Sequence, residues 1–340
     1  MKFKILTALL LASTALHAQD SGLLNLSLEA RVDFQQEMIS GSTVNDNSGF
    51  KGKYLNLRMD GSFNDQFSYS FRQRLNKPLN NASFFDATDW ITLTYTNNNW
   101  SISGGKQVVA IGGYEYDRAP IDLYFCSEFW NNIACYQMGA SVAYTFGDKN
   151  DKLMFQFCES PFRRNEANTL NKEMFAYNLI WYGTHGWFES MYSFNMLECM
   201  PGRYINYVVA GNRFKFGQFR LDLDIMARSV DMNEFGKDMS VMGEFAWTPM
   251  DKINIFLRAS HDWNISNTAG DFCVLPGTKI TRVGGGIEYY PLKNSKNIRL
   301  HLNCCYNNGK NTGVLKPEQT LIDAGLTWKM NMLNIRRKNK

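Results

Sequence analysis

Apolar and polar residues alternate over long stretches of this chain. From residue 24 to residue 35, Leu, Ala, Val and Phe hold the even positions, and polar or charged residues hold the odd ones. Residues 219–228 and 322–332 repeat the pattern with few exceptions. Successive side chains of a β-strand point to opposite faces, whereas a helix repeats every 3.6 residues. The period of two therefore predicts strands with one apolar and one polar face.

About sixteen such segments follow one another, separated by turn-forming Gly, Asn, Asp and Pro. The alternation changes phase near Gly104-Gly105 and near Gly211-Asn212, where we expect β-bulges that shift the facing of the strand. The segments begin near residues 23, 51, 66, 87, 99, 137, 152, 174, 187, 203, 218, 239, 252, 279, 298 and 320.

The connections between the segments are short and long in turn. Outer-membrane barrels have short periplasmic turns and longer extracellular loops, whereas a soluble sandwich has no reason to separate loop lengths in this way. The sequence therefore predicts an all-β fold, a transmembrane antiparallel up-and-down β-barrel of about sixteen strands with both termini at the short-turn end. The long connections lie near residues 38–50, 75–86, 107–136, 159–173, 197–202, 229–238, 262–278 and 307–319.

Aromatic residues concentrate beside the short connections, as Trp100, Trp187 and Trp247 illustrate. Amphipathic rings are favoured at the boundary between membrane and water, so we interpret them as one girdle of the barrel. Aromatic residues are also common in the strands of soluble sheets, which is the alternative interpretation.

The N-terminus has the features of an export signal. Lys2 and Lys4 precede a short apolar segment, and small residues end near residue 18. We expect residues 1–18 to be the signal, residues 19–335 to form the barrel and residues 336–340 to form a basic, solvated tail. The formal net charge of +4 then becomes +2 in the mature chain, and nothing in it indicates a nucleic-acid partner.

Seven cysteines in an exported chain cannot all pair within the chain. Cys126 and Cys135 lie in the same long connection and could form a disulfide. No Cys-x-x-Cys motif or histidine cluster has metal-ligand spacing, so we expect neither a bound metal nor a cofactor.

Two stretches resemble the early strands of the phosphate-selective porin O and P family. They are residues 53–61, Lys-Tyr-Leu-Asn-Leu-Arg-Met-Asp-Gly, and residues 67–72, Phe-Ser-Tyr-Ser-Phe-Arg. The run from Ile102 to Gln107, continuing into Gly112-Gly113-Tyr114-Glu115, resembles a strand end that enters a loop in the same family. The resemblance is best over residues 50–145. It implies a trimeric sixteen-stranded barrel whose third long loop, here residues 107–136, folds into the lumen.

The third long loop departs from what phosphate binding would require. Family members that trap phosphate are expected to carry basic groups there, but this loop is net acidic. We therefore extend the architecture of the family to this chain, and not its phosphate selectivity. The chain also ends in Arg-Arg-Lys-Asn-Lys instead of the terminal aromatic residue common in outer-membrane barrels.

We expect a porin of the Gram-negative outer membrane that lets small hydrophilic solutes or ions, including anions, diffuse passively. Selectivity would come from pore width and from lining charges, and the planar guanidinium suits oxyanions. The alternative is that the arginines on the polar faces of the strands pair with neighbouring acids and make the barrel wall rigid. Lipid and the solutes would be its partners, and a homotrimer its assembly. The expected pore-lining residues are Arg58, Arg72, Arg74, Arg220, Arg258, Arg282 and Arg299, and those of the constriction loop are Asp117, Arg118, Asp122 and Glu128.

Two other functions are compatible with a barrel. An outer-membrane hydrolase would need a nucleophile with a base, but His185, His261 and His301 lack a Gly-x-Ser-x-Gly or similar context, so we expect no enzyme. A binding or structural barrel could present the aromatic residues of the third long loop to a partner.

Overall fold

The computed structural model describes residues 22–77, 84–163, 173–268 and 270–336. The expected export signal, residues 1–18, and most of the expected basic tail lie outside the described residues. None of the helices in the described ranges is long and apolar enough to cross a membrane.

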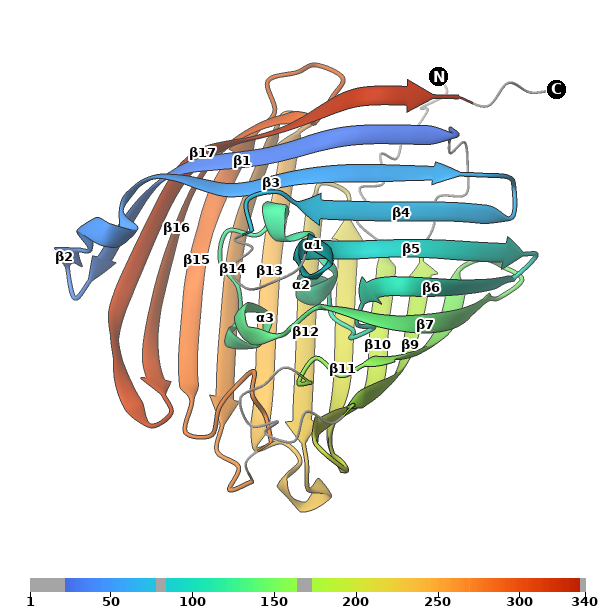
Figure 1. Ribbon diagram of the computed structural model, residues 1–340. Coiled ribbons are helices and arrows are strands. Elements are labelled where there is room, and N and C mark those ends of the chain that lie inside the picture. The colour runs from blue at the N-terminus through green and yellow to red at the C-terminus, as the bar shows by residue number, and fades with distance from the viewer. Residues whose placement is uncertain (1–21, 78–83, 164–172, 269, 337–340) are drawn as a thin grey trace.

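Strands make up most of the described chain (Figure 1). The strands are β1 (Leu24–Ile39), β2 (Ser42–Thr43), β3 (Gly49–Ser62), β4 (Phe67–Arg74), β5 (Thr88–Asn97), β6 (Trp100–Val108), β7 (Tyr136–Thr145), β8 (Asp151–Glu159), β9 (Phe175–His185), β10 (Phe188–Met200), β11 (Arg203–Phe216), β12 (Phe219–Ser229), β13 (Asp238–Met250), β14 (Ile253–Asn264), β15 (Lys279–Tyr289), β16 (Ile298–Asn311) and β17 (Val314–Ile335). Short helices are η1 (Asn45–Asn47), α1 (Phe84–Ala87), α2 (Tyr114–Asp117), η2 (Pro120–Asp122), α3 (Glu128–Asn132) and η3 (Met232–Glu234).

Sixteen of the strands close into one antiparallel barrel, which confirms the expected fold. Each strand from β3 to β16 pairs with the strand that follows it in the chain. Strand β1 closes the ring, because it pairs with β3 on one side and, along its whole length, with β17 on the other. The remaining strand, β2, has two residues and pairs with the end of β1 in the first long connection.

The two faces of the strands point as the alternation predicts. On β1, Val32 and Phe34 are exposed on the outside. Arg31 and Asp33, which alternate with them, are buried in the interior. On β12, Leu223 is exposed and its neighbours in sequence are buried. The barrel is therefore apolar toward lipid and largely polar inside, as a transmembrane barrel requires.

Two connections are shorter than expected. Only Pro201 and Gly202 join β10 to β11, and only Thr312 and Gly313 join β16 to β17. Thr312 and Gly313 both have positive φ angles, 49° and 77°, which is the signature of a two-residue hairpin turn whose twist matches that of the strands. The ladders therefore continue into the stretches that looked like long loops.

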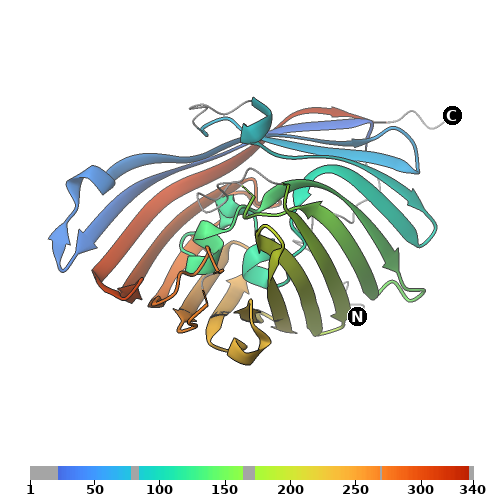
Figure 2. The same ribbon diagram turned by 60° about the horizontal axis from the view of Figure 1, so that its bottom comes forward.

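The expected bulge near Gly104-Gly105 is absent. Strand β6 pairs with both β5 and β7 in unbroken register. The alternation is interrupted because Lys106, a charged residue, lies on the outer face opposite Met138. Its ammonium donates to the carbonyl of Phe85 over 3.1 Å. The α1 segment lies outside the ring of strands (Figure 2). The Lys106 ammonium lies over the ring of Phe85, and the lysine is only 9% exposed.

The expected bulge near Gly211-Asn212 is absent as well, since β11 pairs in unbroken register there with β10 and β12. Here the alternation of apolar and polar residues is interrupted because Ile205, Tyr207 and Val209 are apolar and nevertheless face the interior, where all three are buried. Apolar residues indicate a face that is shielded from water, and both faces of β11 are shielded here.

The aromatic residues beside the short turns contact one another around the barrel. Trp100 packs on Tyr144, with ring centroids 4.9 Å apart. Trp187 stacks on Phe216, and Phe219 stacks on Trp247. These rings are exposed on the outer face, as the predicted girdle requires.

The lipid-facing position of Leu223 gives a direct test of this orientation. Leu223 lies at the middle of β12, so we expect Leu223→Arg to lower the free energy of unfolding in lipid vesicles by about 2–4 kcal/mol. Leu223→Ala removes apolar surface without adding a charge and serves as the control. A charge that cost no more than the alanine would contradict the assigned lipid face.

Candidate permeation pathway

The third long loop, residues 109–135 between β6 and β7, lies inside the barrel, as expected. Figures 1 and 2 show its helices α2 and α3 enclosed by the ring of strands. Several of its backbone groups bond to polar side chains of the wall. The carboxylate of Asp224 accepts the N–H groups of Tyr114 and Glu115 over 2.9 and 2.8 Å. Asn195 donates to the carbonyl of Ala110 over 2.7 Å. These bonds satisfy backbone groups that water no longer reaches.

Ion pairs hold the first half of the third long loop against β12, β13 and β14. Arg118 donates to both carboxylate oxygens of Glu244, over 2.6 and 2.7 Å. Arg258 pairs at 2.5 Å with Glu115, whose carboxylate also accepts the N–H of Ser127. Paired charges of this kind are the strong class of hydrogen bond, and they fix the loop to one side of the lumen.

The second half of the third long loop is held by arginines of β15, β16 and β1. Arg299 pairs with Asp122 over 2.8 Å, and Arg282 pairs with Glu128 over 2.5 Å. Arg31 donates to the carbonyl of Leu123 over 2.6 Å. The loop is therefore attached to the wall from β10 to β16 and, beyond it, to β1.

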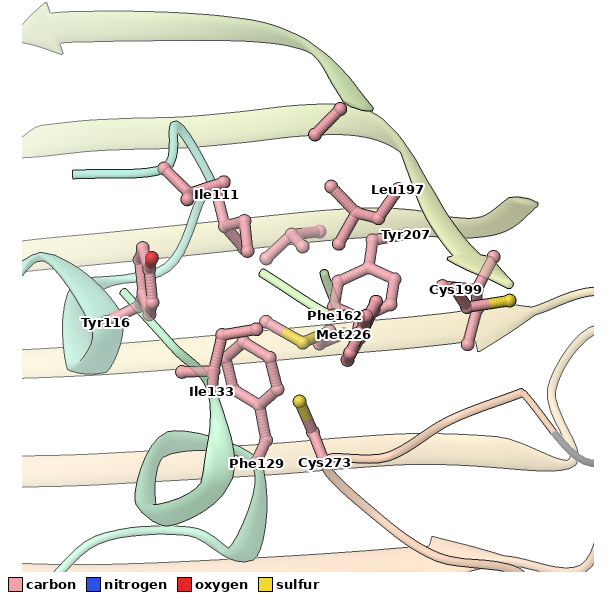
Figure 3. Close-up of a cluster of buried hydrophobic side chains, with 14 of the residues drawn as sticks. Ile111, Tyr116, Phe129, Ile133, Phe162, Leu197, Cys199, Tyr207, Met226 and Cys273 are labelled. Carbon is pink, nitrogen blue, oxygen red and sulfur yellow. The ribbon is translucent and has the colours of Figure 1, made fainter. Parts of the chain in front are cut away.

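Part of the interior is apolar. An interior apolar cluster (Figure 3) joins the third long loop to β8, β10, β11 and β12 and to the connection after β14. Its larger described members are Val109, Ile111, Tyr116, Phe129, Ile133, Phe162, Met174, Leu197, Cys199, Ile205, Tyr207, Val209, Met226, Cys273 and Val274. These side chains explain why β11 is apolar on its inner face.

The connection between β14 and β15 reaches into this cluster and is anchored by charge. Arg228 is completely buried, and its ion pairs reach Asp238 at 2.8 Å and Asp271 at 2.7 Å. The other oxygen of Asp271 accepts the N–H groups of Cys273 and Val274. Removing one partner from such a buried pair is costly, so this connection is held in place.

The seven arginines expected to line the pore all belong to strands of the barrel and pair with acids of its interior, but they differ in exposure. The side chains of Arg58, Arg74 and Arg220 are 34, 25 and 33% exposed. Those of Arg72, Arg258, Arg282 and Arg299 are less than 10% exposed and hold neighbouring acids or the third long loop. The second group therefore acts in the way that the alternative interpretation described.

Three exposed cations of the interior are absent from the expected set. Lys53 is 27% exposed, Lys215 is 39% exposed and Lys329 is 38% exposed. Lys215 lies between Phe214 and Phe216 in a clear alternation, so its inward facing could have been predicted. Lys53 sits at a break in the register between β1 and β3, which no local pattern indicates.

The four residues expected at the constriction all lie on the third long loop. Arg118, Asp122 and Glu128 take part in the pairs described above, and Asp122 remains 39% exposed. No hydrogen bond or ion pair to the carboxylate of Asp117 occurs within the described residues. Burial raises the pKa of Asp117 to about 6, although Arg213, Lys152 and Arg118 act in the opposite direction.

The other candidate residues do not form a reactive site. Cys126 and Cys135 are free thiols in the structure, so the disulfide that the sequence allowed is absent. His185 pairs with Asp151 at 3.0 Å, and His301 lies 3.1 Å from Asp33. Within the described ranges, no group of three or more His, Cys, Asp or Glu side chains could hold a metal ion.

Glu244 is the acid on which Arg118, Arg220 and Arg258 converge. We expect Glu244→Gln to lower the free energy of unfolding in detergent by about 3 kcal/mol, because it removes one of two acid partners from each arginine and leaves them only Asp222 or Glu115. The control is Asp60→Asn, whose partner Arg58 is a third exposed, so its loss should cost at most about 1 kcal/mol. Equal effects of the two variants would show that the convergent pairs do not hold the loop.

Asp117 should make stability depend on pH. Its pKa of about 6 in the folded chain lies above the ordinary value of 3.8, so stability falls as pH rises through this window. We therefore expect Asp117→Asn to raise the melting temperature at pH 7 and to have no effect near pH 4. A difference that instead grew on acidification would contradict the raised pKa.

Comparisons with known proteins agree with this geometry. The family model described as phosphate-selective porin O and P matches residues 24–178. A search of curated protein sequences finds no match. The anion-selective porin from Comamonas acidovorans superposes with a TM-score of 0.58 at 12% identity, covering 90% of this chain and 99% of that chain.

Two other solved structures have the same fold. The outer membrane channel DcaP of Acinetobacter baumannii has a TM-score of 0.63 at 12% identity, covering 90% of this chain and 97% of that chain. OmpT of Vibrio cholerae, in its trimer form, has a TM-score of 0.60 at 13% identity, covering 92% and 100%. The chain thus has the fold of outer-membrane porins, and its residues 24–178 match the model of the phosphate-selective porin O and P family.

Proposed function

We propose that this porin lets small hydrophilic solutes diffuse passively and that it favours anions. At the level of the third long loop the route runs along the wall of β1, β3, β4 and β17, because the opposite side holds the interior apolar cluster. Nearer the short turns, the route also passes Lys215 and Arg220 at the ends of β11 and β12. The long connections would face the outside of the cell and the short turns the periplasm.

The observation that carries the anion preference is an imbalance in exposure. In the interior ion pairs, the cation is usually the more exposed partner: Arg74 is 25% exposed and its partner Asp89 only 2%. Lys215 is 39% exposed and Glu189 only 5%. A solute in the lumen therefore meets more positive than negative groups. In the interior ion pairs, the cations whose side chains are at least 19% exposed are Lys53, Arg58, Arg74, Arg118, Lys215, Arg220 and Lys329. The acids that reach the same exposure are Asp60 and Asp122.

We propose outer-membrane lipid as the surroundings of the apolar outer face and a homotrimer as the assembly. A trimer form of the structurally similar OmpT supports the latter. We expect no nucleic-acid partner, no cofactor and no catalytic activity, since passive diffusion requires no reacting group.

A binding or structural barrel is the second candidate, because the interior apolar cluster closes part of the lumen. Planar-bilayer recording separates the two: a purified, folded protein without any conductance would favour the second candidate and exclude the porin.

The reversal potential under a salt gradient tests the anion preference. We expect a wild-type potential of the anion-selective sign. We expect the double variant R74Q/K215Q to lower the anion-to-cation permeability ratio by about two- to fourfold, because a unit charge 4–8 Å away in water contributes roughly 0.5–1 kcal/mol.

The matched control is Lys149→Gln, which removes a charge from a short turn outside the lumen. It should leave the permeability ratio unchanged. A cation-selective wild type would contradict the proposal, and so would a control that acts as strongly as the lumenal variants.

A further inference from the structure

A cavity of about 360 Å³ lies between the third long loop and the wall, near the loop end of the barrel. The wall contributes residues of β1, β3, β15, β16 and β17, and the loop contributes residues 123–126 and part of α3. Its size is within the range of sites for small molecules. Neither the ion pairs of the loop nor the general anion preference accounts for its lining.

A β-bulge supplies one of the lining cations. Arg31 of β1 pairs with Tyr54, and the next residue, Val32, pairs with Gly52, so Lys53 has no partner in the ladder. A bulge re-aims the side chains around it. Both Lys53 and Tyr54 consequently reach the cavity. The ammonium of Lys53 donates to Gln35 and lies 4.0 Å from Asp323, whose side chain is buried behind it.

All charged residues that line the cavity in the described chain are cations: Arg31, Lys53 and Arg282. Arg282 is only 7% exposed, and its Nη1 has no hydrogen-bond partner in the described structure. That nitrogen lies 3.6 Å from a carboxylate oxygen of Asp262. A buried donor without an acceptor is costly, so the lining here favours an anionic acceptor.

The rest of the lining is mainly apolar or aromatic. Phe125 and Trp130 come from the third long loop, Leu321 from β17, and Tyr54 from β3. A hydrated inorganic anion gains nothing from these side chains, whereas a ring or an alkyl group would bury apolar surface against them.

We propose that this cavity binds a small organic monocarboxylate with an aromatic or apolar body. The carboxylate lies toward Lys53 and Arg282, and the body lies against Phe125, Trp130 and Leu321. The proposal deepens the proposed function, since such a ligand would be a solute that the anion-favouring pore admits and retains on its way.

Isothermal titration calorimetry on the full-length protein in detergent tests the site without requiring a current. The probe is phenylacetate, compared with acetate, which lacks the ring, and with phenylacetamide, which lacks the charge. Lys53→Met removes the lining ammonium. Lys215→Met is the matched control, because it removes an equally lumenal lysine that does not line the cavity.

We expect phenylacetate to bind about tenfold more tightly than either partial analogue, since a charged hydrogen bond or a buried ring contributes at least about 1.4 kcal/mol. Lys53→Met should weaken binding of phenylacetate about tenfold, and Lys215→Met should leave it unchanged. No binding of phenylacetate, equal binding of acetate, or equal effects of the two variants would each overturn the site.

Planar-bilayer recordings on the same preparations keep the two proposals apart. A protein that conducts but does not bind phenylacetate lacks this site and is still a porin. A protein that binds phenylacetate in the expected order but does not conduct has the site, and it is not the proposed pore.

Discussion

The hydrocarbon of the membrane sets the constraint from which the rest of this structure follows. A backbone N–H or C=O without a partner costs several kcal/mol in lipid, so every strand must be paired on both sides. The long antiparallel pairing of β1 with β17 meets this requirement by closing the sheet. Closure of sixteen strands leaves an interior too wide for the wall's own side chains to fill. The third long loop and the connection after β14 occupy part of that space.

A loop inside a barrel needs partners for its own backbone, and this need determines how the interior charges are used. The N–H groups of the loop require acceptors, which carboxylates such as Asp224, Glu115 and Asp262 provide. Its carbonyls require donors, which Arg31 and Arg299 provide. The acids lie close to the backbone that they bind and become buried. The longer side chains of arginine and lysine extend their charges farther from the wall, so several of them stay in contact with water.

The sequence was sufficient to predict the strands, their two faces and the girdle, because the period of two and the turn residues are local signals. The inward third loop was expected only from the resemblance to a porin family. The inner face of β11 was beyond reach, since Tyr207 packs against Phe129 of a loop nearly eighty residues away. The burial of Arg258, Arg282 and Arg299 depends on the same loop. The sequence therefore could not show that these arginines are buried whereas Arg58 is exposed. The unpaired position of Lys53 depends on the register between two strands, which alternation within one strand does not determine.

The net charge of the chain is for the same reason a poor guide to the charge that a solute meets. Between the expected signal and tail, acids exceed bases by two. Yet Asp33, Asp262 and Asp323 are almost completely buried, where hydrogen-bond donors and cations surround most of their charge. A solute in the lumen meets only the charged groups that stay exposed to water. In the pairs of Lys215 and Arg74, the exposed group is the cation. A barrel of near-neutral composition can thus present a cationic lumen, because anchoring a loop inside it buries acids in preference to bases.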